Sequence, residues 1–455
     1  MHCGVPAAHS LIMNEAQLDD LIAYLKFPSV STDSRHAGDV LQCAEWLREK
    51  MVSQGLEADI HETAGHPVVV GRNRHVEGRP TVMIYGHYDV QPADPLELWD
   101  SPPFEPRIEG GKIYARGSTD NKGQNLAHIL GIGERIAAEG DLPVNVIVLV
   151  EGEEEIGSPN LELFLEQHKE DLACDIVAVS DTGMLAAGLG TFTYGLRGIT
   201  CMELKVRGPE MDLHSGVFGG AVANPALAAA QIAASLHHAD GRIAVEGFYD
   251  RVEQLQDWER DNWAQLPVPA DETLDLTGAP DLFGEAGFTD TERRWARPTA
   301  EVNGIGGGYQ GEGSKTVIPA EAFVKFSFRL VPDQDPKEIL ELVRAHCEKS
   351  TPPGVSVDYD FGHSGKAYVM DPQSGFGKAA QKALEQTFGA KPALIREGGS
   401  IPIVQTFRDV LGVDTLLLGL ALPDCRIHSP NENFLLQNFF DGIRLNRHLL
   451  QALAE

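Results

Sequence analysis

Four short apolar runs constrain the fold of this chain more than any other feature of its sequence. They are TVMIYG (81–86), VNVIVLV (144–150), DIVAVS (175–180) and DTLLLGL (414–420). Their apolar residues are continuous and do not alternate with polar ones, which is typical of strands buried on both faces of a parallel sheet. Helical patterns near 123–139, 377–388 and 434–453 lie between or after these runs. The order predicts an α/β domain with a mostly parallel sheet flanked by helices.

The middle of the chain has a different pattern. The segments ITCMELKVRG (199–208) and EAFVKFSFRLV (321–331) alternate apolar and polar residues, which predicts half-exposed strands of an antiparallel sheet. Helices are predicted at 224–238 and 336–348. A single core stops growing at about 250 to 300 residues, so a chain of 455 residues favours two domains. We expect a smaller α+β domain at 197–365, inserted into a larger domain made of 1–196 and 366–455.

Charge and cysteine usage exclude several classes of protein. With 37 Lys and Arg against 67 Asp and Glu, the net charge of −30 argues against binding to nucleic acid or to anionic membranes. No run of 18 apolar residues and no basic start followed by an apolar segment is present, so neither membrane spanning nor secretion is expected. Six scattered cysteines without a CxxC pair favour reduced thiols in the cytoplasm over a thiolate zinc site or a disulfide framework.

The first polar group stands at the end of the run at 81–86, where His87 and Asp89 follow. In an extended chain residues i and i+2 project to the same face. Asp89 can therefore accept a hydrogen bond from one ring nitrogen of His87 while the other nitrogen binds a metal ion. Taken alone, the pair is better explained as a buried polar contact that closes a strand.

Other acidic residues stand at comparable places. Asp120 comes immediately before the helix predicted from about Gly123, where a carboxylate often serves only as a helix cap. The run at 144–150 leads into four crowded carboxylates, namely Glu151, Glu153, Glu154 and Glu155. A solvated acidic loop would tolerate their mutual repulsion, whereas a neighbouring divalent cation would explain it directly.

Together these residues form a pattern that none of them forms alone. Asp181 and His428 also follow predicted strands, and the carboxyl edge of an open α/β sheet is where ligands gather. Imidazoles and carboxylates without sulfur suit zinc, manganese or cobalt. Two histidines and three carboxylates would give each of two ions one imidazole and one terminal carboxylate, with a bridging Asp and a shared water. A further glutamate of the run would take the proton of that water, and the spacing leaves Glu153, Glu154 and Glu155 open for these roles.

From about residue 15 to 453 the chain resembles a known family through an ordered series of motifs. They are GHYDVQPA, ARGSTDNKGQ, EGEEEIGS, TYGLRGI, DLHSGVFGG, KTVIP, FSFRLVPDQ, REGGSIP and HSPNE. They are similar to those of the cocatalytic metallopeptidases, which include cytosolic nonspecific dipeptidase, carnosinase, glutamate carboxypeptidase and succinyl-diaminopimelate desuccinylase. The likeness is closest to the dipeptidase and carnosinase branch. It implies a metal-dependent hydrolase that cleaves the amide bond of dipeptides or short peptides with a free C-terminal carboxylate.

The resemblance also implies a role for each residue of the metal site. Two divalent ions, with zinc expected first and manganese or cobalt as alternatives, would be bound by His87, Asp120, Glu155, Asp181 and His428. Asp120 would bridge them. Glu154 would be the general base, and Asp89 would orient His87. The Asp120–Asn121 peptide bond would be cis.

In the family the smaller domain is a lid that also mediates dimerisation. By resemblance His214 would reach the active site of the partner in a homodimer, and the substrate would contact Thr316, Arg329, Gly399 and Ser400. Deacylases of the family usually carry Asn in place of Thr316, which favours the dipeptidase branch. The alternative enzyme is an N-acyl-amino-acid amidohydrolase with the same metal residues. The alternative outside enzymes is a metal-dead binding protein on the same scaffold, which would lack a ligand or the base.

Overall fold

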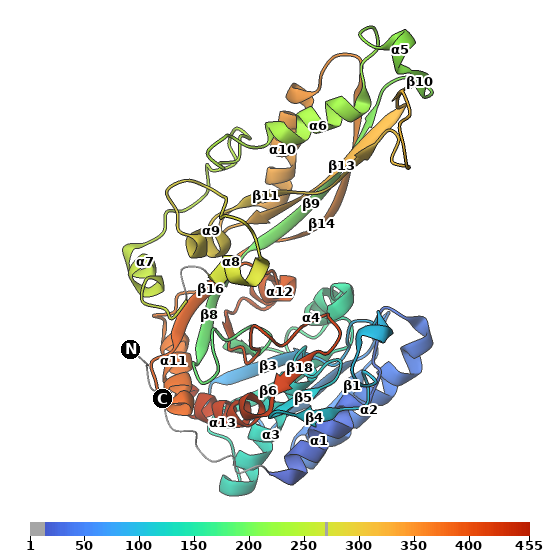
Figure 1. Ribbon diagram of the computed structural model, residues 1–455. Helices are drawn as coiled ribbons and strands as arrows, with labels where there is room; N and C mark the ends of the chain where they lie inside the picture. Colours follow the sequence, from blue (N-terminus) through green and yellow to red (C-terminus); the bar gives the residue numbers. More distant parts are fainter. Residues whose placement is uncertain (1–13, 269–271) are drawn as a thin grey trace. The chain divides into compact units, whose positions relative to one another are not determined.

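The structure is a computed structural model that describes residues 14–268 and 272–455 (Figure 1). Its internal contacts divide the chain into two units. Of the described residues, those up to Tyr194 form the first unit with Met370–Leu394 and Thr406–Glu455, and those between Gly195 and Val369 form the second with Ile395–Gln405. The start of the chain, which contains Cys3 and on which the expectation about secretion depended, lies outside the described residues.

The first unit is built on a sheet whose centre consists of four parallel strands. These are, in spatial order, β6 (Asn145–Glu151), β3 (Thr81–His87), β7 (Ile176–Val179) and β17 (Thr415–Leu417). They coincide with the four apolar runs and are almost wholly buried, so the predicted α/β fold is confirmed. The full order is β1-β2-β6-β3-β7-β17-β8-β15, with β16 pairing β8. Because the flanking pairs are antiparallel, the sheet as a whole is mixed.

Helices cover both faces of this sheet (Figure 1). On one face α2 (Ala37–Ser53) packs against β1 (Glu57–His61) and β2 (Val68–Arg72), and α3 (Lys122–Glu139) packs against β3. Helices α1 (Glu15–Leu25) and α13 (Leu436–Leu453) pack against α3, and α13 also packs against α11 (Gly375–Phe388). On the opposite face α4 (Leu161–Gln167) places Phe164 against the ring of His61. The predicted helices are thus present.

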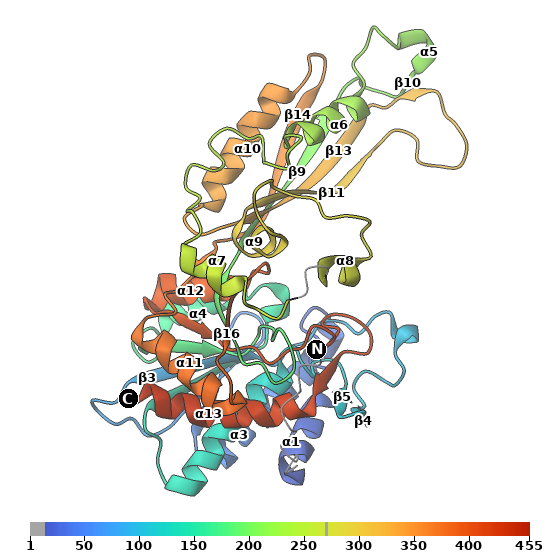
Figure 2. The same cartoon turned by 60° about the vertical axis from the view of Figure 1, so that its left-hand side comes forward.

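The second unit contains an antiparallel sheet with the order β11-β13-β9-β14 (Figure 2). Its strands are β11 (Thr299–Gly307), β13 (Glu321–Leu330), β9 (Gly198–Arg207) and β14 (Ser356–Gly365). Burial alternates residue by residue along β9 and β13, as the sequence pattern predicts. The buried face carries Phe326 and Phe328 and packs against α6 (Pro225–Ser235) and α10 (Pro336–Ser350). Both helices begin with an Asn or Asp cap followed by proline, which favours initiation at these residues.

The remaining elements are short. The strands are β4 (Arg107–Glu109), β5 (Lys112–Tyr114), β8 (Thr191–Leu196), β10 (Leu213–His214), β12 (Val317–Ile318), β15 (Tyr368–Val369), β16 (Ala393–Glu397) and β18 (Asn433–Leu435). The helices are α5 (Ser215–Phe218), α7 (Asp257–Trp263), α8 (Glu272–Thr277), α9 (Asp290–Ala296) and α12 (Pro402–Leu411), with 3-10 turns at Ser34–His36, Leu96–Leu98 and Glu154–Ile156. Strand β18 pairs with β5, and β10 pairs with β12.

One segment belongs to a different unit from the one expected. The sequence analysis assigns the whole of 366–455 to the larger domain, whereas Ile395–Gln405 clusters with the second unit. The reason is a set of contacts with that unit. Arg329 donates to Ser400 Oγ at 2.9 Å, and Arg197 Nε donates to the carbonyl oxygen of Gly398 at 3.2 Å.

Two further expectations concern cysteines and membranes. Cys43, Cys174, Cys201, Cys347 and Cys425 are free thiols. Among the helices of the described chain, none combines the length and the apolar character needed to cross a membrane.

Candidate metal centre

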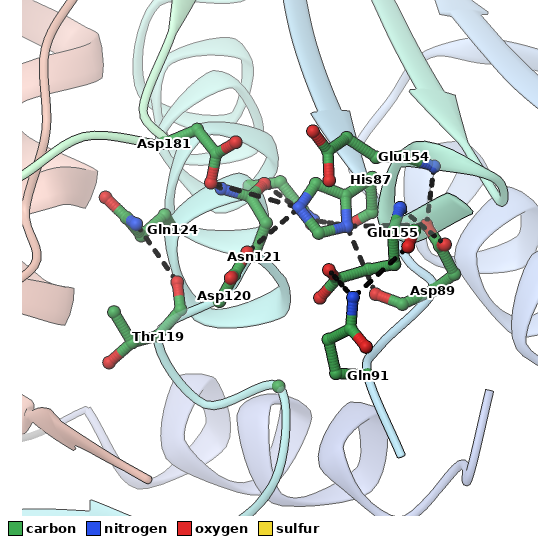
Figure 3. Close-up of polar contacts among 12 residues, drawn as sticks. His87, Asp89, Gln91, Thr119, Asp120, Asn121, Gln124, Glu154, Glu155 and Asp181 are labelled. Atoms are coloured by element: carbon green, nitrogen blue, oxygen red, sulfur yellow. Dashed lines mark hydrogen bonds and ion pairs between the residues drawn. The ribbon is translucent and has the colours of Figure 1, made fainter. Parts of the chain in front are cut away.

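The carboxyl edge of the parallel strands brings the predicted ligands together. Figure 3 shows four of them, His87, Asp120, Glu155 and Asp181. His87 is the last residue of β3 and pairs in register with Glu151 of β6, and Asp181 follows β7 on the other side of β3. Neighbouring parallel strands end at the same edge, so their following residues converge. Asp120 precedes α3, whose first turn lies against β3, and His428 lies in the loop between β17 and β18.

Five of the predicted residues form two trios that could each hold a metal ion. In the first, His87 Nε2 lies 3.1 Å from Asp120 Oδ1 and 3.8 Å from Asp181 Oδ1. In the second, His428 Nε2 lies 2.9 Å from Asp120 Oδ2 and 3.2 Å from Glu155 Oε2. Asp120 belongs to both trios and presents a different oxygen to each. This arrangement gives each trio one imidazole, one terminal carboxylate and one shared carboxylate.

Asp89 holds both His87 and the glutamate loop. His87 Nδ1 faces Asp89, 3.4 Å from its Oδ1 and 3.1 Å from its carbonyl oxygen, which directs Nε2 into the first trio. The Asp89 carboxylate also accepts hydrogen bonds from the backbone N–H of Glu154 at 3.2 Å and of Glu155 at 3.1 Å. The sequence suggested the contact with His87. The second role was not predicted, because it joins residues more than sixty positions apart.

Tertiary contacts distinguish the roles of the four glutamates that are crowded in the sequence. Glu151 accepts hydrogen bonds from the hydroxyls of Tyr85 and Ser158, and Glu153 accepts them from His66 N and Asn160 Nδ2. Both are therefore engaged in supporting the loop. Of the other two, Glu155 reaches His428. The carboxylate of Glu154 makes no hydrogen bond within the described chain and turns toward the imidazole of His87 (Figure 3).

The electrostatics of this edge favour bound cations. Burial raises the pKa of Glu154, Glu155 and Asp181. Burial acts in the same direction on Asp120, but hydrogen bonds from His428 and His87 bring its pKa below the usual range. Hydrogen bonds to Asp120 and Glu155 raise the pKa of His428 to about 10. The clustered carboxylates thus need positive charge, and divalent ions would supply it while leaving both imidazoles neutral as ligands. The residues therefore fit a pair of divalent ions.

Three amide side chains that the sequence analysis did not single out support the ligands. Gln91 Nε2 donates to Glu155 Oε2 at 2.9 Å. Asn121 Nδ2 donates to Asp181 Oδ1 at 2.8 Å, and Asn125 Nδ2 donates to the carbonyl oxygen of His87 at 2.6 Å. Gln91 and Asn121 lie inside quoted motifs, which is the only signal that could have indicated them. The Asp120–Asn121 peptide bond is cis, as predicted.

The residues predicted to contact substrate all lie in the second unit, where they form two groups. His214 on β10 lies beside Thr316, whose carbonyl oxygen accepts a hydrogen bond from Ser215 N at 3.0 Å. Arg329 on β13 donates to Ser400 Oγ, and Gly399 directly precedes that serine. His214 is exposed, and its Nδ1 accepts a hydrogen bond from Gly216 N at 3.0 Å.

The second unit also contains a cavity of about 910 Å³ with a cationic wall. Arg197, Arg294, Arg297 and Arg329 are among its lining residues. Arg297 pairs with Glu285 and Arg294 with Asp290, whereas neither Arg197 nor Arg329 makes an ion pair within the described ranges. Burial, together with the charge of Arg329, lowers the pKa of Arg197 to about 10, so the guanidinium group of Arg197 stays charged at neutral pH. Such a wall fits an anionic group.

Comparisons with known proteins indicate the family of the chain. The model of the peptidase family M20/M25/M40 matches residues 83–452. The Cys-Gly metallodipeptidase of Saccharomyces cerevisiae is 33% identical over 451 residues, which are 95% of this chain and 94% of the relative. The human beta-Ala-His dipeptidase is 32% identical over 397 residues, covering 86% of this chain and 78% of the relative. The crystal structure of an M20 family metallo-carboxypeptidase from Sulfolobus solfataricus superimposes with a TM-score of 0.85 at 33% identity, over 97% of this chain and 100% of that one.

The separate contacts of the glutamates predict different effects for three matched substitutions. Glu154→Gln should keep metal binding and lower turnover by about 10² to 10⁴ or more, because it removes a carboxylate that no other group engages. Glu155→Gln should weaken metal binding itself. Glu153→Gln is the control and should change neither, since its contacts are with His66 and Asn160. Metal content and kcat would be measured for all three, and metal retained by Glu155→Gln with only the rate lost would reverse the assignment of Glu154 and Glu155.

Proposed function

The chain belongs to peptidase family M20/M25/M40, and from this premise we propose that it is a dinuclear metallopeptidase that cleaves the amide bond of dipeptides with a free C-terminal carboxylate. The observation that carries the proposal is the placement of Asp120, whose two oxygens face two different imidazoles. Each imidazole has one further carboxylate beside it. The names of the yeast and human relatives support a dipeptide as the substrate.

The two trios are the proposed binding sites of two divalent ions, with zinc expected first and manganese or cobalt as alternatives. When bound, such a pair lowers the pKa of a water molecule and stabilises the negative charge that develops on the substrate carbonyl oxygen. The chain's contribution is to fix the ligand atoms. Asp89 orients His87, Gln91 holds Glu155 and Asn121 holds Asp181.

Glu154 is the proposed general base. Burial raises the pKa of its carboxyl group, which makes it a better proton acceptor than an exposed glutamate. It would take a proton from the attacking water and deliver that proton to the leaving amine. Its backbone N–H is bonded to Asp89, so the loop is fixed while the carboxylate stays available.

Arg329 and the Gly399–Ser400 segment are proposed to bind the substrate carboxylate. The guanidinium group can form two parallel hydrogen bonds to a carboxylate. Arg329 already contacts Ser400 Oγ, and Arg197 adds a second unpaired positive charge to the same cavity wall. Thr316 would contact the remainder of the substrate.

We also propose that the active form is a homodimer in which His214 acts at the site of the neighbouring subunit. Gly216 N donates to His214 Nδ1, so the neutral ring carries its hydrogen on Nε2. That N–H can donate to a substrate carbonyl oxygen.

The metal proposal predicts two ions per chain. Protein stripped with a chelator and reloaded with zinc or manganese should saturate at two ions, and chelation should abolish hydrolysis until metal is restored, since no other activated nucleophile is proposed. Elemental analysis and dipeptide hydrolysis would be measured on the same samples. Saturation at one ion or none would contradict the dinuclear mechanism.

The carboxylate proposal predicts that Arg329→Ala lowers kcat/KM for dipeptides by about 10²-fold, because a bound carboxylate would lose its charged partner. C-terminal dipeptide amides should be poor substrates of the wild type. Arg329→Ala should lower kcat/KM for these amides little further. Arg207→Ala is the control, since Arg207 lies on the neighbouring strand and pairs with Asp358. Equal cleavage of amides and free dipeptides would exclude the carboxylate clamp, and a preference for N-succinyl amino acids would indicate an N-acyl-amino-acid amidohydrolase.

The dimer proposal predicts that two inactive variants complement each other. His214→Ala and Glu154→Gln proteins should each have low activity, and hybrid dimers should regain one working site that combines Glu154 of one subunit with His214 of the other. Activity would be followed after subunit exchange confirmed by native mass spectrometry. Confirmed exchange without recovery would show that His214 does not act between subunits.

A further inference from the structure

Glu432 is a fully buried carboxylate with an unusually complete set of hydrogen-bond donors. Its exposed fraction is 0%. Oε2 accepts from Arg116 Nη1 at 2.8 Å and from Gly117 N at 2.9 Å. Oε1 accepts from Thr119 N at 2.9 Å and from Asp120 N at 3.0 Å. Each oxygen thus has two donors, and one of the four belongs to the backbone of Asp120.

The donors all come from one short turn, 116–120, that leads to Asp120. Unpaired backbone N–H groups in a buried turn are costly, so the turn depends on an acceptor from outside it. Glu432 supplies that acceptor. The ion pair with Arg116, which is 1% exposed, balances the charge of the carboxylate. The orientation of the Asp120 backbone is therefore set from a distant part of the sequence.

Glu432 also ends the loop that carries His428. Three non-glycine residues of this loop have left-handed backbone conformations, namely Arg426 (φ 58°), His428 (φ 57°) and Asn431 (φ 64°). Such conformations are unfavourable for residues that carry a Cβ atom and persist only where surrounding contacts hold them. Glu432 provides such contacts through its side chain, and its carbonyl oxygen accepts from Ala115 N at 3.1 Å.

We propose that Glu432 is a positioning residue that fixes Asp120 and His428 relative to each other. Both residues belong to the second trio, and their atoms lie 2.9 Å apart. Glu432 touches no reacting group and acts through the two loops that it joins. The inference rests on the proposed function, because it assigns a residue that organises the metal site on which that function depends.

A carboxylate is required because all four partners are donors. Glutamine has nearly the same shape but offers a donor NH₂ group in place of one oxygen. In Glu432→Gln the NH₂ group would replace one of the two oxygens. Whichever oxygen it replaced, its N–H groups would face two N–H donors of the turn and could accept from neither. Groups that orient metal ligands typically contribute 10- to 100-fold to metal affinity or activity when they are removed.

The test measures metal affinity apart from catalysis. Zn²⁺ would be titrated into metal-free wild type, Glu432→Gln and Glu292→Gln in competition with a chromophoric chelator, and kcat, KM and the metal-free melting temperature would be determined. Glu292 is the matched control, a buried carboxylate of the second unit that accepts from Thr289 N at 2.8 Å. Glu432→Gln should weaken the binding of at least one of the two Zn²⁺ ions by 10- to 100-fold and lower kcat more than it changes KM. Glu292→Gln should lower only the melting temperature.

The possible outcomes are distinct. If the wild type binds two ions and Glu432→Gln binds both with unchanged affinity and kcat, the inference is overturned. Equal weakening by Glu292→Gln would also overturn it, since that result shows a general loss of stability. If Glu432→Gln does not fold, Glu432→Asp gives the same comparison, because it keeps the charge and withdraws the carboxylate by one methylene. A wild type that binds fewer than two ions would instead defeat the proposed function.

Discussion

The parallel pairing of β3 with β6 and β7 is the constraint on which the site depends. The register places His87 beside Glu151 and ends β7 next to β3, so an imidazole, a glutamate loop and Asp181 must share one edge of the sheet. All three strands are buried, which fixes their register through core packing. The polar residues cannot move apart without disrupting that core. Other groups at this edge donate hydrogen bonds to the clustered carboxylates and so offset the cost of burying them together.

The carboxylates at this edge fall into classes according to the groups that their oxygens contact. Asp89, Glu153 and Glu432 accept hydrogen bonds from backbone N–H groups and hold loops in place. The ligand carboxylates instead face imidazole nitrogens across gaps in which a cation fits. Glu154 belongs to neither class, because no donor within the described chain engages its carboxylate. Burial raises the pKa of this carboxyl group, a property that suits the role of general base proposed for it.

The functional side chains of the two units differ in charge. The first unit collects acidic side chains that call for cations. The second, in a chain with a net charge of −30, has unpaired guanidinium groups of Arg197 and Arg329 in one cavity. Divalent cations suit the acidic side chains of the first unit, and an anionic group suits the guanidinium groups of the second. The segment Ile395–Gln405 follows the first unit's Met370–Leu394 in the sequence but clusters with the second unit. Its hydrogen bonds with Arg197 and Arg329 are part of that packing.

The sequence by itself determined the α/β fold and the strand ends at which the candidate ligands stand. Continuous apolar runs report burial on both faces, and alternation reports burial on one, so the central strands and the half-exposed strands β9 and β13 could be predicted. Only the tertiary structure decided which oxygen of Asp120 faces which imidazole and how the crowded glutamates are used. It also assigned supporting roles to Gln91 and Glu432, whose partners lie 64 and more than 300 positions away. Local periodicity records which face of an element is buried, but it carries no information about the partner that a polar side chain meets there.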